Sequence, residues 1–379
     1  MILKASSRGV VSPFVVMDVM REANALEAAG KRILHLEVGQ PATGAPKGVI
    51  KNISKLTKER LGYTEAFGLE CLRERIAHFY FVNYGVKVPT GRIAITTGSS
   101  GGFVLSFLAA FDSGQRVGVS APGYPAYRNI LKSLGVEVVE ILTDSSTNFQ
   151  PTVDLLRNLD SPIDGLIIAS PSNPTGTMID ADNLNMLSCF CEEREIRVIS
   201  DEIYHGITYG KKARTMLEFS DQAIVVNSFS KYFSMTGWRI GWCILPIELV
   251  RSFECLSQNL YISPPTLSQY AGMAAFDCID ELEQNVERYA RNREVLLKEL
   301  PKAGFNDLAS VEGAFYIYAN VKDMADNSSI LCHNMLVETG VAATPGVDFD
   351  PIRGENYIRF SFSGTTEEII EATQRLLEW

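Results

Sequence analysis

The sequence predicts an α/β fold, with a large domain built on a mostly parallel sheet and a smaller α+β domain formed by both ends of the chain. Between about residues 90 and 246, short runs of apolar and β-branched residues alternate with longer helical patterns. Strand runs that are apolar almost throughout predict a sheet covered on both faces, as parallel sheets usually are. A chain of 379 residues, 46% of them hydrophobic, is long enough for two or three domains with a large core.

The chain before residue 90 begins with a helix and a short strand. The helix is expected to end at Gly30, because apolar residues recur before it at the spacing of one helix face, namely at Val16, Val19, Met20, Ala23 and Leu26. A strand is expected at 33–38, followed by a turn-rich stretch at 39–46 that contains several Gly and Pro residues.

The central region predicts seven strands, separated in most cases by helices. The strands are expected at 93–97, 117–120, 136–141, 166–169, 198–200, 223–228 and 240–245. Helical patterns occupy 102–111, 126–134, 151–159 and 181–195. This alternation predicts a seven-stranded sheet sandwiched by helices.

After about residue 246 the pattern becomes helical and then mixed. We expect a long charged helix, two short strands and a closing helix, at 279–300, 314–321, 357–362 and 367–379 respectively. The predicted large domain is therefore 46–280, and the predicted small domain combines 1–45 with 281–379.

Composition and charge exclude several classes of protein. Lysine and arginine total 35 and acidic residues 45, and the resulting net charge of −10 disfavours nucleic acids and anionic membranes as partners. The 7 cysteines are scattered without a CxxC pair, and no histidine has a ligand-spaced partner, so we expect reduced thiols and no metal site. The first residues lack the apolar run of a signal peptide. These features predict a cytoplasmic protein.

Two loops that follow predicted strands carry residues suited to binding an anion and to presenting a reactive amine. The loop Thr97-Gly-Ser-Ser-Gly-Gly102 opens a helix, so its backbone N–H groups could bind an anion, although a tight turn closed by a serine cap is the better explanation of this loop taken alone. Lys231 lies among aromatic and small residues, where burial would lower its pKa. Ser228 and Arg239, a hydroxyl and a guanidinium near that lysine, suit a phosphate.

The segment around Lys231 closely resembles the pyridoxal-phosphate lysine signature of class I/II aminotransferases, the aspartate aminotransferase-like group of fold-type I enzymes. Segments similar to other motifs of this family follow in the expected order, namely Tyr63-Thr-Glu-Ala-Phe-Gly-Leu-Glu-Cys-Leu-Arg73, Ala121-Pro-Gly-Tyr-Pro-Ala-Tyr127, Ser170-Pro-Ser-Asn-Pro-Thr-Gly176, Asp201-Glu-Ile-Tyr204 and Tyr357-Ile-Arg-Phe-Ser361. The resemblance thus covers most of the chain.

The resemblance implies catalytic roles for three residues. Lys231 would form the internal Schiff base with pyridoxal 5′-phosphate and, once freed, would carry a proton as general base and acid. Asp201 would face the ring nitrogen and keep it protonated. Tyr204, together with Asn173, would hydrogen-bond the phenolic oxygen of the ring. Without the resemblance, Asp201 could equally be a helix N-cap, and Asn173 a turn residue before proline.

Further residues are assigned to the cofactor by the same resemblance. Tyr124 would stack on the pyridine ring. The phosphate would be bound by side chains and one backbone amide, from Ser99, Ser100, Gly101, Ser228 and Arg239. Tyr63 would reach the phosphate of the neighbouring subunit, which implies a homodimer with shared active sites.

The substrate is expected to bind through its α-carboxylate. The resemblance assigns Arg359 to a bidentate grip on that carboxylate, with Asn173 and the backbone amide of Gly39 beside it. No second arginine is evident for a dicarboxylate side chain, so strict use of aspartate or glutamate is not expected. Phe14, Tyr63 and Tyr124 indicate a pocket that accepts apolar or aromatic side chains.

The sequence is therefore interpreted as an aminotransferase that moves an amino group from an α-amino acid to a 2-oxo acid. A C–S lyase acting by β-elimination, or a cyclopropane-forming synthase, remains open because these enzymes share the scaffold. A non-catalytic relative that binds the cofactor is a second alternative. A nicotinamide or nucleotide enzyme is a third, disfavoured because the glycine fingerprint GxGxxG is missing.

Overall fold

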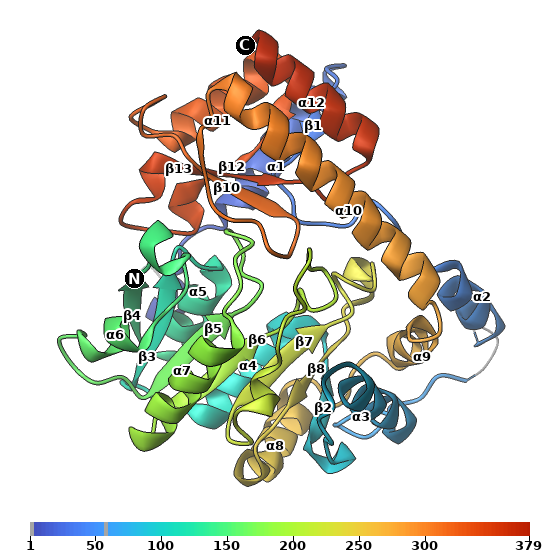
Figure 1. Ribbon diagram of the computed structural model, residues 1–379. Coiled ribbons are helices and arrows are strands. Elements are labelled where there is room, and N and C mark those ends of the chain that lie inside the picture. The colour runs from blue at the N-terminus through green and yellow to red at the C-terminus, as the bar shows by residue number, and fades with distance from the viewer. Residues whose placement is uncertain (1–3, 57–59) are drawn as a thin grey trace.

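The computed structural model describes residues 4–56 and 60–379 of the chain. A seven-stranded sheet with helices on both faces forms one half of the molecule, and two small sheets with four helices form the other (Figure 1). The strands of the large sheet are β2 Ile93–Thr96, β3 Arg116–Ala121, β4 Glu137–Leu142, β5 Gly165–Ala169, β6 Arg197–Asp201, β7 Ile224–Ser228 and β8 Gly241–Ile244. The predicted α/β class with a mostly parallel sheet is confirmed.

The strand order is β2-β8-β7-β6-β5-β3-β4. All neighbouring strands are parallel except at β8, which pairs antiparallel with both β7 and β2. The carboxyl ends of β5, β6 and β7 consequently meet at one edge of the sheet, where ligands of open α/β sheets usually bind.

The helices, in chain order, are α1 Val15–Ala28, α2 Lys47–Leu56, α3 Glu70–Tyr84, α4 Gly98–Ala110, α5 Pro125–Leu134, α6 Val153–Arg157, α7 Ala181–Glu193, α8 Val250–Leu260, α9 Thr266–Ala275, α10 Ile279–Glu299, α11 Ser328–Thr339 and α12 Thr366–Glu378. Within the described ranges, none is long and apolar enough to cross a membrane.

Alternation along the buried strands builds a core on each face of the large sheet. In β5, Leu166 and Ile168 join the cluster that contains residues of α7, whereas Ile167 joins the cluster that contains residues of α4, α5 and α8. Because successive side chains of a strand point to opposite faces, one apolar run fills both cores.

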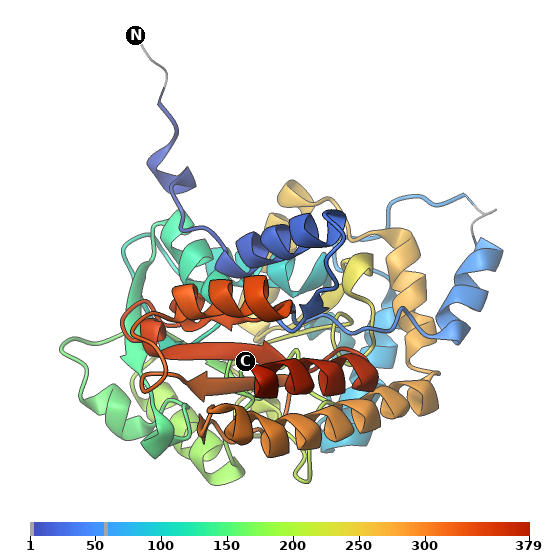
Figure 2. The ribbon, with the colours of Figure 1, turned by 90° about the horizontal axis from the view of Figure 1, so that it is seen from above.

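The second half of the molecule combines both ends of the chain. β12 Thr344–Pro345, β13 Tyr357–Ser361, β10 Tyr316–Asn320 and β9 Asp307–Leu308 form an antiparallel sheet in that order, and β1 Leu34–His35 pairs in parallel with β11 Val341–Ala342. Helices α1, α11, α12 and part of α10 cover these sheets (Figures 1 and 2). Since α10 runs alongside both halves, the division at residues 46 and 280 stays a prediction.

Some predicted elements differ in length from the observed ones. The helix expected at 151–159 is confined to α6, because Thr152 caps its start by accepting the Leu155 amide. The strand expected at 33–38 is ordered as a strand only over β1. The helix expected at 102–111 begins earlier, at Gly98.

Candidate active site

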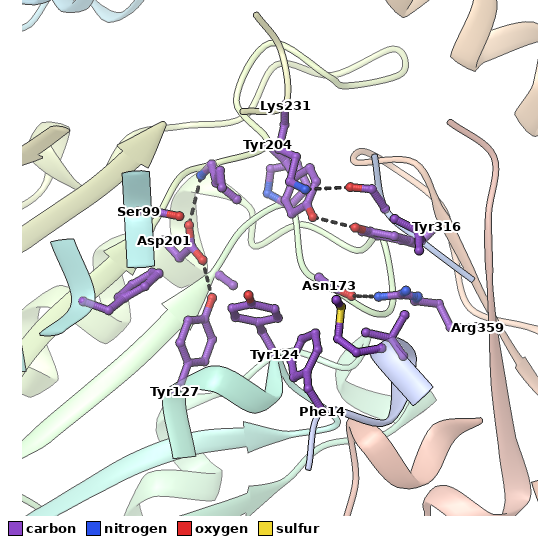
Figure 3. Close-up of a pocket in the computed structure, with 18 residues that line it drawn as sticks. Phe14, Ser99, Tyr124, Tyr127, Asn173, Asp201, Tyr204, Lys231, Tyr316 and Arg359 are labelled. Atoms are coloured by element: carbon purple, nitrogen blue, oxygen red, sulfur yellow. Dashed lines mark hydrogen bonds between the residues drawn. The ribbon is translucent and has the colours of Figure 1, made fainter. Parts of the chain in front are cut away.

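A cavity of about 170 Å³ lies where the carboxyl ends of β5 and β6 face α1 and the small sheets. Figure 3 shows that its polar side chains converge from both halves of the molecule. It is lined by Phe14, Val16, Met17, Val38, Gly39, Ser99, Phe103, Tyr124, Tyr127, Ala169, Pro171, Asn173, Asp201, Ile203, Tyr204, Lys231, Tyr316 and Arg359.

The Lys231 amine enters this cavity from the loop after β7. Its Nζ donates a hydrogen bond to the carbonyl oxygen of Gly39, at 2.6 Å. Burial, followed by the nearby guanidinium groups of Arg359 and Arg239, lowers the pKa of Lys231 to about 8, although the Asp201 carboxylate opposes this shift. A substantial fraction of the amine is therefore neutral, and nucleophilic, near physiological pH.

Asp201 is the last residue of β6, and its carboxyl group is buried. Oδ2 accepts a hydrogen bond from the Tyr127 hydroxyl, and Oδ1 accepts one from the Ile203 N–H at 3.1 Å. Burial raises the pKa of the Asp201 carboxyl to about 6, against the effect of these two donors and of Lys231. The carboxylate is thus held in a buried position, where little water screens its charge and its attraction for a cationic partner is strong.

Two hydroxyls lie together on the opposite side of the cavity. The Tyr204 and Tyr316 hydroxyl oxygens are 2.7 Å apart, so one donates to the other. Burial holds the pKa of Tyr204 well above its usual value. The pair therefore stays protonated and can present one hydrogen-bond donor to a bound oxygen.

Arg359, in β13, is 3% exposed and is held by three oxygens. Nη1 donates to Asn173 Oδ1 at 2.8 Å, while Nη2 donates to the Glu37 carbonyl and to Thr344 Oγ1. Its Nε has no hydrogen-bond partner among the described residues.

Two aromatic rings flank the same guanidinium. Its carbon lies 4.4 Å from the ring centre of Tyr316 and 4.6 Å from that of Phe349. These rings restrict the guanidinium plane, so the cation is already oriented for a planar carboxylate.

The start of α4 and the Arg239 side chain form a site that we call the α4 cradle, beside the loop that carries Lys231. A Cβ atom placed on Gly98, whose φ is +74°, would come within 2.6 Å of Arg239 Nη2, so glycine is required for the guanidinium to approach the helix. Thr97 precedes the helix without a side-chain capping bond. The first N–H groups of α4 and the Arg239 cation therefore face the same space, as anion sites require.

Aromatic side chains form the floor of the cavity. The Tyr124 ring, at the N-cap of α5, packs edge-on against Tyr127, with ring centres 5.3 Å apart. Phe14 packs edge-on against the other side, at 5.8 Å. These contacts fix the Tyr124 ring, which leaves its face available to a flat ligand.

The family model for aminotransferases of class I and II matches residues 31–376. The chain belongs to this family. Enzymes of the family use pyridoxal phosphate, and this aminotransferase transfers an amino group from an amino acid to a 2-oxo acid.

Individual relatives cover almost all of this aminotransferase. The chain is 44% identical to a valine–pyruvate aminotransferase of Mycobacterium tuberculosis, over 99% of this chain and 98% of that protein. A crystal structure of an aminotransferase from the same organism, also 44% identical, superimposes with a TM-score of 0.98 and covers 100% and 99% of the two chains. Aspartate aminotransferase from Thermus thermophilus, solved with maleate, is 26% identical, has a TM-score of 0.93, and is matched over 100% of both chains.

The structure of this aminotransferase brings most of the predicted site residues together. Eight of them line the one cavity, namely Gly39, Ser99, Tyr124, Asn173, Asp201, Tyr204, Lys231 and Arg359. Four others lie at or beside the α4 cradle without lining the cavity, namely Ser100, Gly101, Ser228 and Arg239. Tyr63 lies elsewhere and is 83% exposed. In Gly39, the carbonyl oxygen is engaged by Lys231, whereas the prediction concerned its amide.

Sequence reasoning missed two tyrosines that organise the cavity. Tyr127 follows Tyr124 by three positions, which is one turn of α5, so this spacing could have revealed it. Tyr316 carries no such signal, because its role depends on how the segment before β10 meets the segment after β6, where Thr208 and Gly313 form an antiparallel bridge. A Cβ atom on Gly39 would also collide with the Tyr316 hydroxyl, 1.7 Å away.

The lowered pKa of Lys231 predicts how the free amine reacts. A neutral amine is the nucleophile, so acylation of Lys231 in the cofactor-free chain should rise with pH and reach half its maximum at about 8. Mass-spectrometric quantification of the acylated peptides across a pH series measures this curve, and the peptide with the exposed Lys51 provides the comparison. Identical curves for both lysines would contradict the prediction.

Proposed function

We propose that this aminotransferase holds pyridoxal 5′-phosphate through Lys231 and takes an aliphatic α-amino acid as donor. The observation that carries the proposal is that Lys231, Asp201 and Arg359 share one cavity, part of whose wall is apolar. An amine, a buried carboxylate and a fixed guanidinium are the groups that such a transfer needs.

The residues of the cavity fit the cofactor. The buried Asp201 carboxylate would face the protonated ring nitrogen, whose positive charge would offset the cost of burying the carboxylate. Tyr124 would lie against the ring face, and Tyr204 with Asn173 would reach the phenolic oxygen. The Arg239 guanidinium lies so close to the start of α4 that a Cβ at Gly98 would collide with it. This approach supports binding of the phosphate by Ser99, Ser100, the Gly101 amide, Ser228 and Arg239.

When bound, the cofactor supplies an electron-accepting ring that stabilises negative charge at the substrate Cα. Lys231 then acts on the proton of that carbon: its neutral amine removes the proton as a general base and returns it as a general acid. The lowered pKa supports this dual role, because both forms of the amine are populated at similar pH.

Arg359 and Asn173 orient the substrate. We assign the α-carboxylate to the Arg359 guanidinium, whose Nε lacks a partner and whose plane is fixed between Tyr316 and Phe349. A carboxylate held in this way presents one bond of Cα to the Lys231 amine, and orientation of this kind contributes strongly to rate.

The donor side chain is assigned to the wall formed by Phe14, Val16, Met17 and Val38. Lys231 and Arg359 are the only cations among the described residues that line the cavity, so a side-chain carboxylate would have no further partner from this chain. The M. tuberculosis relative named as a valine–pyruvate aminotransferase supports a branched aliphatic donor and pyruvate as acceptor.

We also propose a homodimer with shared sites. Tyr63 is 83% exposed although it belongs to the Y-x-x-x-x-G-x-x-x-L-R motif, and an exposed aromatic residue of this kind is suited to contact a second copy of the chain.

Valine and leucine are expected to exceed aspartate and glutamate as donors by about 100-fold in kcat/KM, because an unpaired carboxylate against the apolar wall is costly to desolvate. The measurement is a donor panel with the cofactor-loaded enzyme, using pyruvate and 2-oxoglutarate as acceptors.

Reactions without an acceptor are the control in that panel. Release of ammonia and a 2-oxo acid from β-substituted donors in the absence of acceptor would favour the C–S lyase alternative. Binding of cofactor without turnover of any donor would favour the non-catalytic alternative. Preference for acidic donors would overturn the assignment of the apolar wall.

A further inference from the structure

We propose that Asp348 is a positioning residue that holds the start of α1 and thereby sets the wall against which the donor side chain packs. The effect on donor choice rests on the proposed function, whereas the effect on α1 does not. Asp348 lies in the short 3-10 turn Gly346–Asp348, far from α1 in the sequence.

The start of α1 lacks a cap from its own sequence. The N-cap residue is Phe14, which makes no capping hydrogen bond. Asp348 supplies the acceptors instead: Oδ1 accepts from the Val15 N–H at 3.1 Å and Oδ2 from the Val16 N–H at 3.2 Å. Asp348 is 4% exposed, so water does not compete strongly for these bonds. A carboxylate at a helix N-terminus is also favoured by the helix dipole.

The turn that carries Asp348 is anchored to the large sheet's side of the cavity. Arg128, in α5, donates from Nη1 to the Asp348 carbonyl at 3.1 Å and from Nη2 to the Phe349 carbonyl at 2.7 Å. The Gly123 N–H donates to the same Phe349 carbonyl at 3.0 Å. Gly123 directly precedes Tyr124, so the side chain of Asp348 holds α1 while its backbone is fixed beside the aromatic floor.

This arrangement couples two walls of the cavity through one residue. Phe14, Val16 and Met17, at the start of α1, form part of the apolar wall. Loss of the Asp348 contacts would loosen the start of α1 and, with it, the packing of Phe14 against Tyr124. A larger, looser pocket should weaken binding of branched donors more than binding of alanine, whose methyl group hardly reaches the wall.

The first test measures the helix itself. Asp348→Asn keeps one acceptor oxygen, but its NH2 group replaces the other and cannot accept from the second N–H of α1. We therefore expect the amide hydrogens of residues 15–20 to exchange about 5- to 10-fold faster in the full, cofactor-loaded chain. Asp350→Asn is the matched control. Asp350 is buried in the following turn, and its bonds go to Ile352 and Arg353 and not to α1, so exchange of residues 15–20 should stay unchanged.

The second test measures donor selection. We expect Asp348→Asn to raise KM for valine about 5- to 10-fold and KM for alanine less than about 2-fold, while Asp350→Asn leaves the ratio of the two donors unchanged. If Asp348→Asn fails to fold, Asp348→Ser, which keeps a single hydroxyl acceptor, replaces it in both tests.

The outcomes separate this inference from the proposed function. Unchanged exchange of residues 15–20 in Asp348→Asn overturns the positioning role, even if the unaltered enzyme prefers valine. Faster exchange with an unchanged ratio of donors overturns the link between α1 and selection. Preference of the unaltered enzyme for acidic donors overturns the proposed donor class, while the exchange experiment still decides whether Asp348 holds α1.

Discussion

Replacing Lys231 by alanine is expected to lower the rate of transamination by about 10⁴-fold, because the variant loses both the amine that binds the cofactor and the base that acts at Cα. The fold should persist. Among the described residues the amine makes one hydrogen bond, to Gly39, and burial lowers its pKa, so the site disfavours its charged form. The measurement is single-turnover kinetics with an aliphatic donor, alongside unfolding curves for both proteins.

Borohydride reduction identifies the amine directly. In the unaltered enzyme, peptide mapping after reduction should find the cofactor on Lys231, and in Lys231→Ala the label should be absent. Lys51→Ala, which removes an exposed lysine of α2, should keep both label and activity. A label on another lysine, or activity within tenfold of the unaltered enzyme, would contradict the assignment.

Replacing Asp201 by asparagine is expected to lower activity by about 10³-fold, since the charge that keeps the ring nitrogen protonated is lost. The same change should make the cofactor-free chain more stable at neutral pH. The pKa of Asp201 is raised to about 6 in the folded state, from an ordinary value of 3.8, so folding disfavours the ionised carboxylate. The corresponding penalty above pH 6 is about 3 kcal/mol, from which lost hydrogen bonds must be subtracted.

The sign of this effect makes it testable by pH. The gain in unfolding free energy of Asp201→Asn should be full above about pH 6, diminish as the pH falls, and vanish below about pH 4, where the carboxyl is protonated in both states. Urea unfolding at several pH values measures it. As a control, Asp350→Asn should destabilise the chain, because it breaks bonds to Arg353. A loss of stability in Asp201→Asn at neutral pH would refute the argument.

The sequence was sufficient to predict elements whose signal is local. The strands of the large sheet are short and bounded by turns, and except in the edge strand β4 their mostly apolar side chains fill a core on each face. Asp201 and Lys231 could be found because they follow such strands directly, at the edge where ligands bind.

Features that depend on contacts between distant segments could not be predicted. Tyr316 meets Tyr204 because the segment before β10 pairs with the segment after β6, at Thr208 and Gly313, and Asp348 meets α1 across more than 300 positions. The antiparallel direction of β8 was also not predicted. It follows from the connection after β7, which contains a short 3-10 turn, Thr236–Trp238, in place of the longer helix that a parallel crossover usually requires.

Helix α10 contacts both the loop that carries Lys231 and the C-terminal helix. Its 21 residues form a rod about 31 Å long that contacts the loop carrying Lys231 near one end, where Tyr232 donates to Glu283 at 2.5 Å, and that also packs on α12. The position of the loop that carries Lys231 is therefore tied, through this one helix, to the C-terminal helix α12.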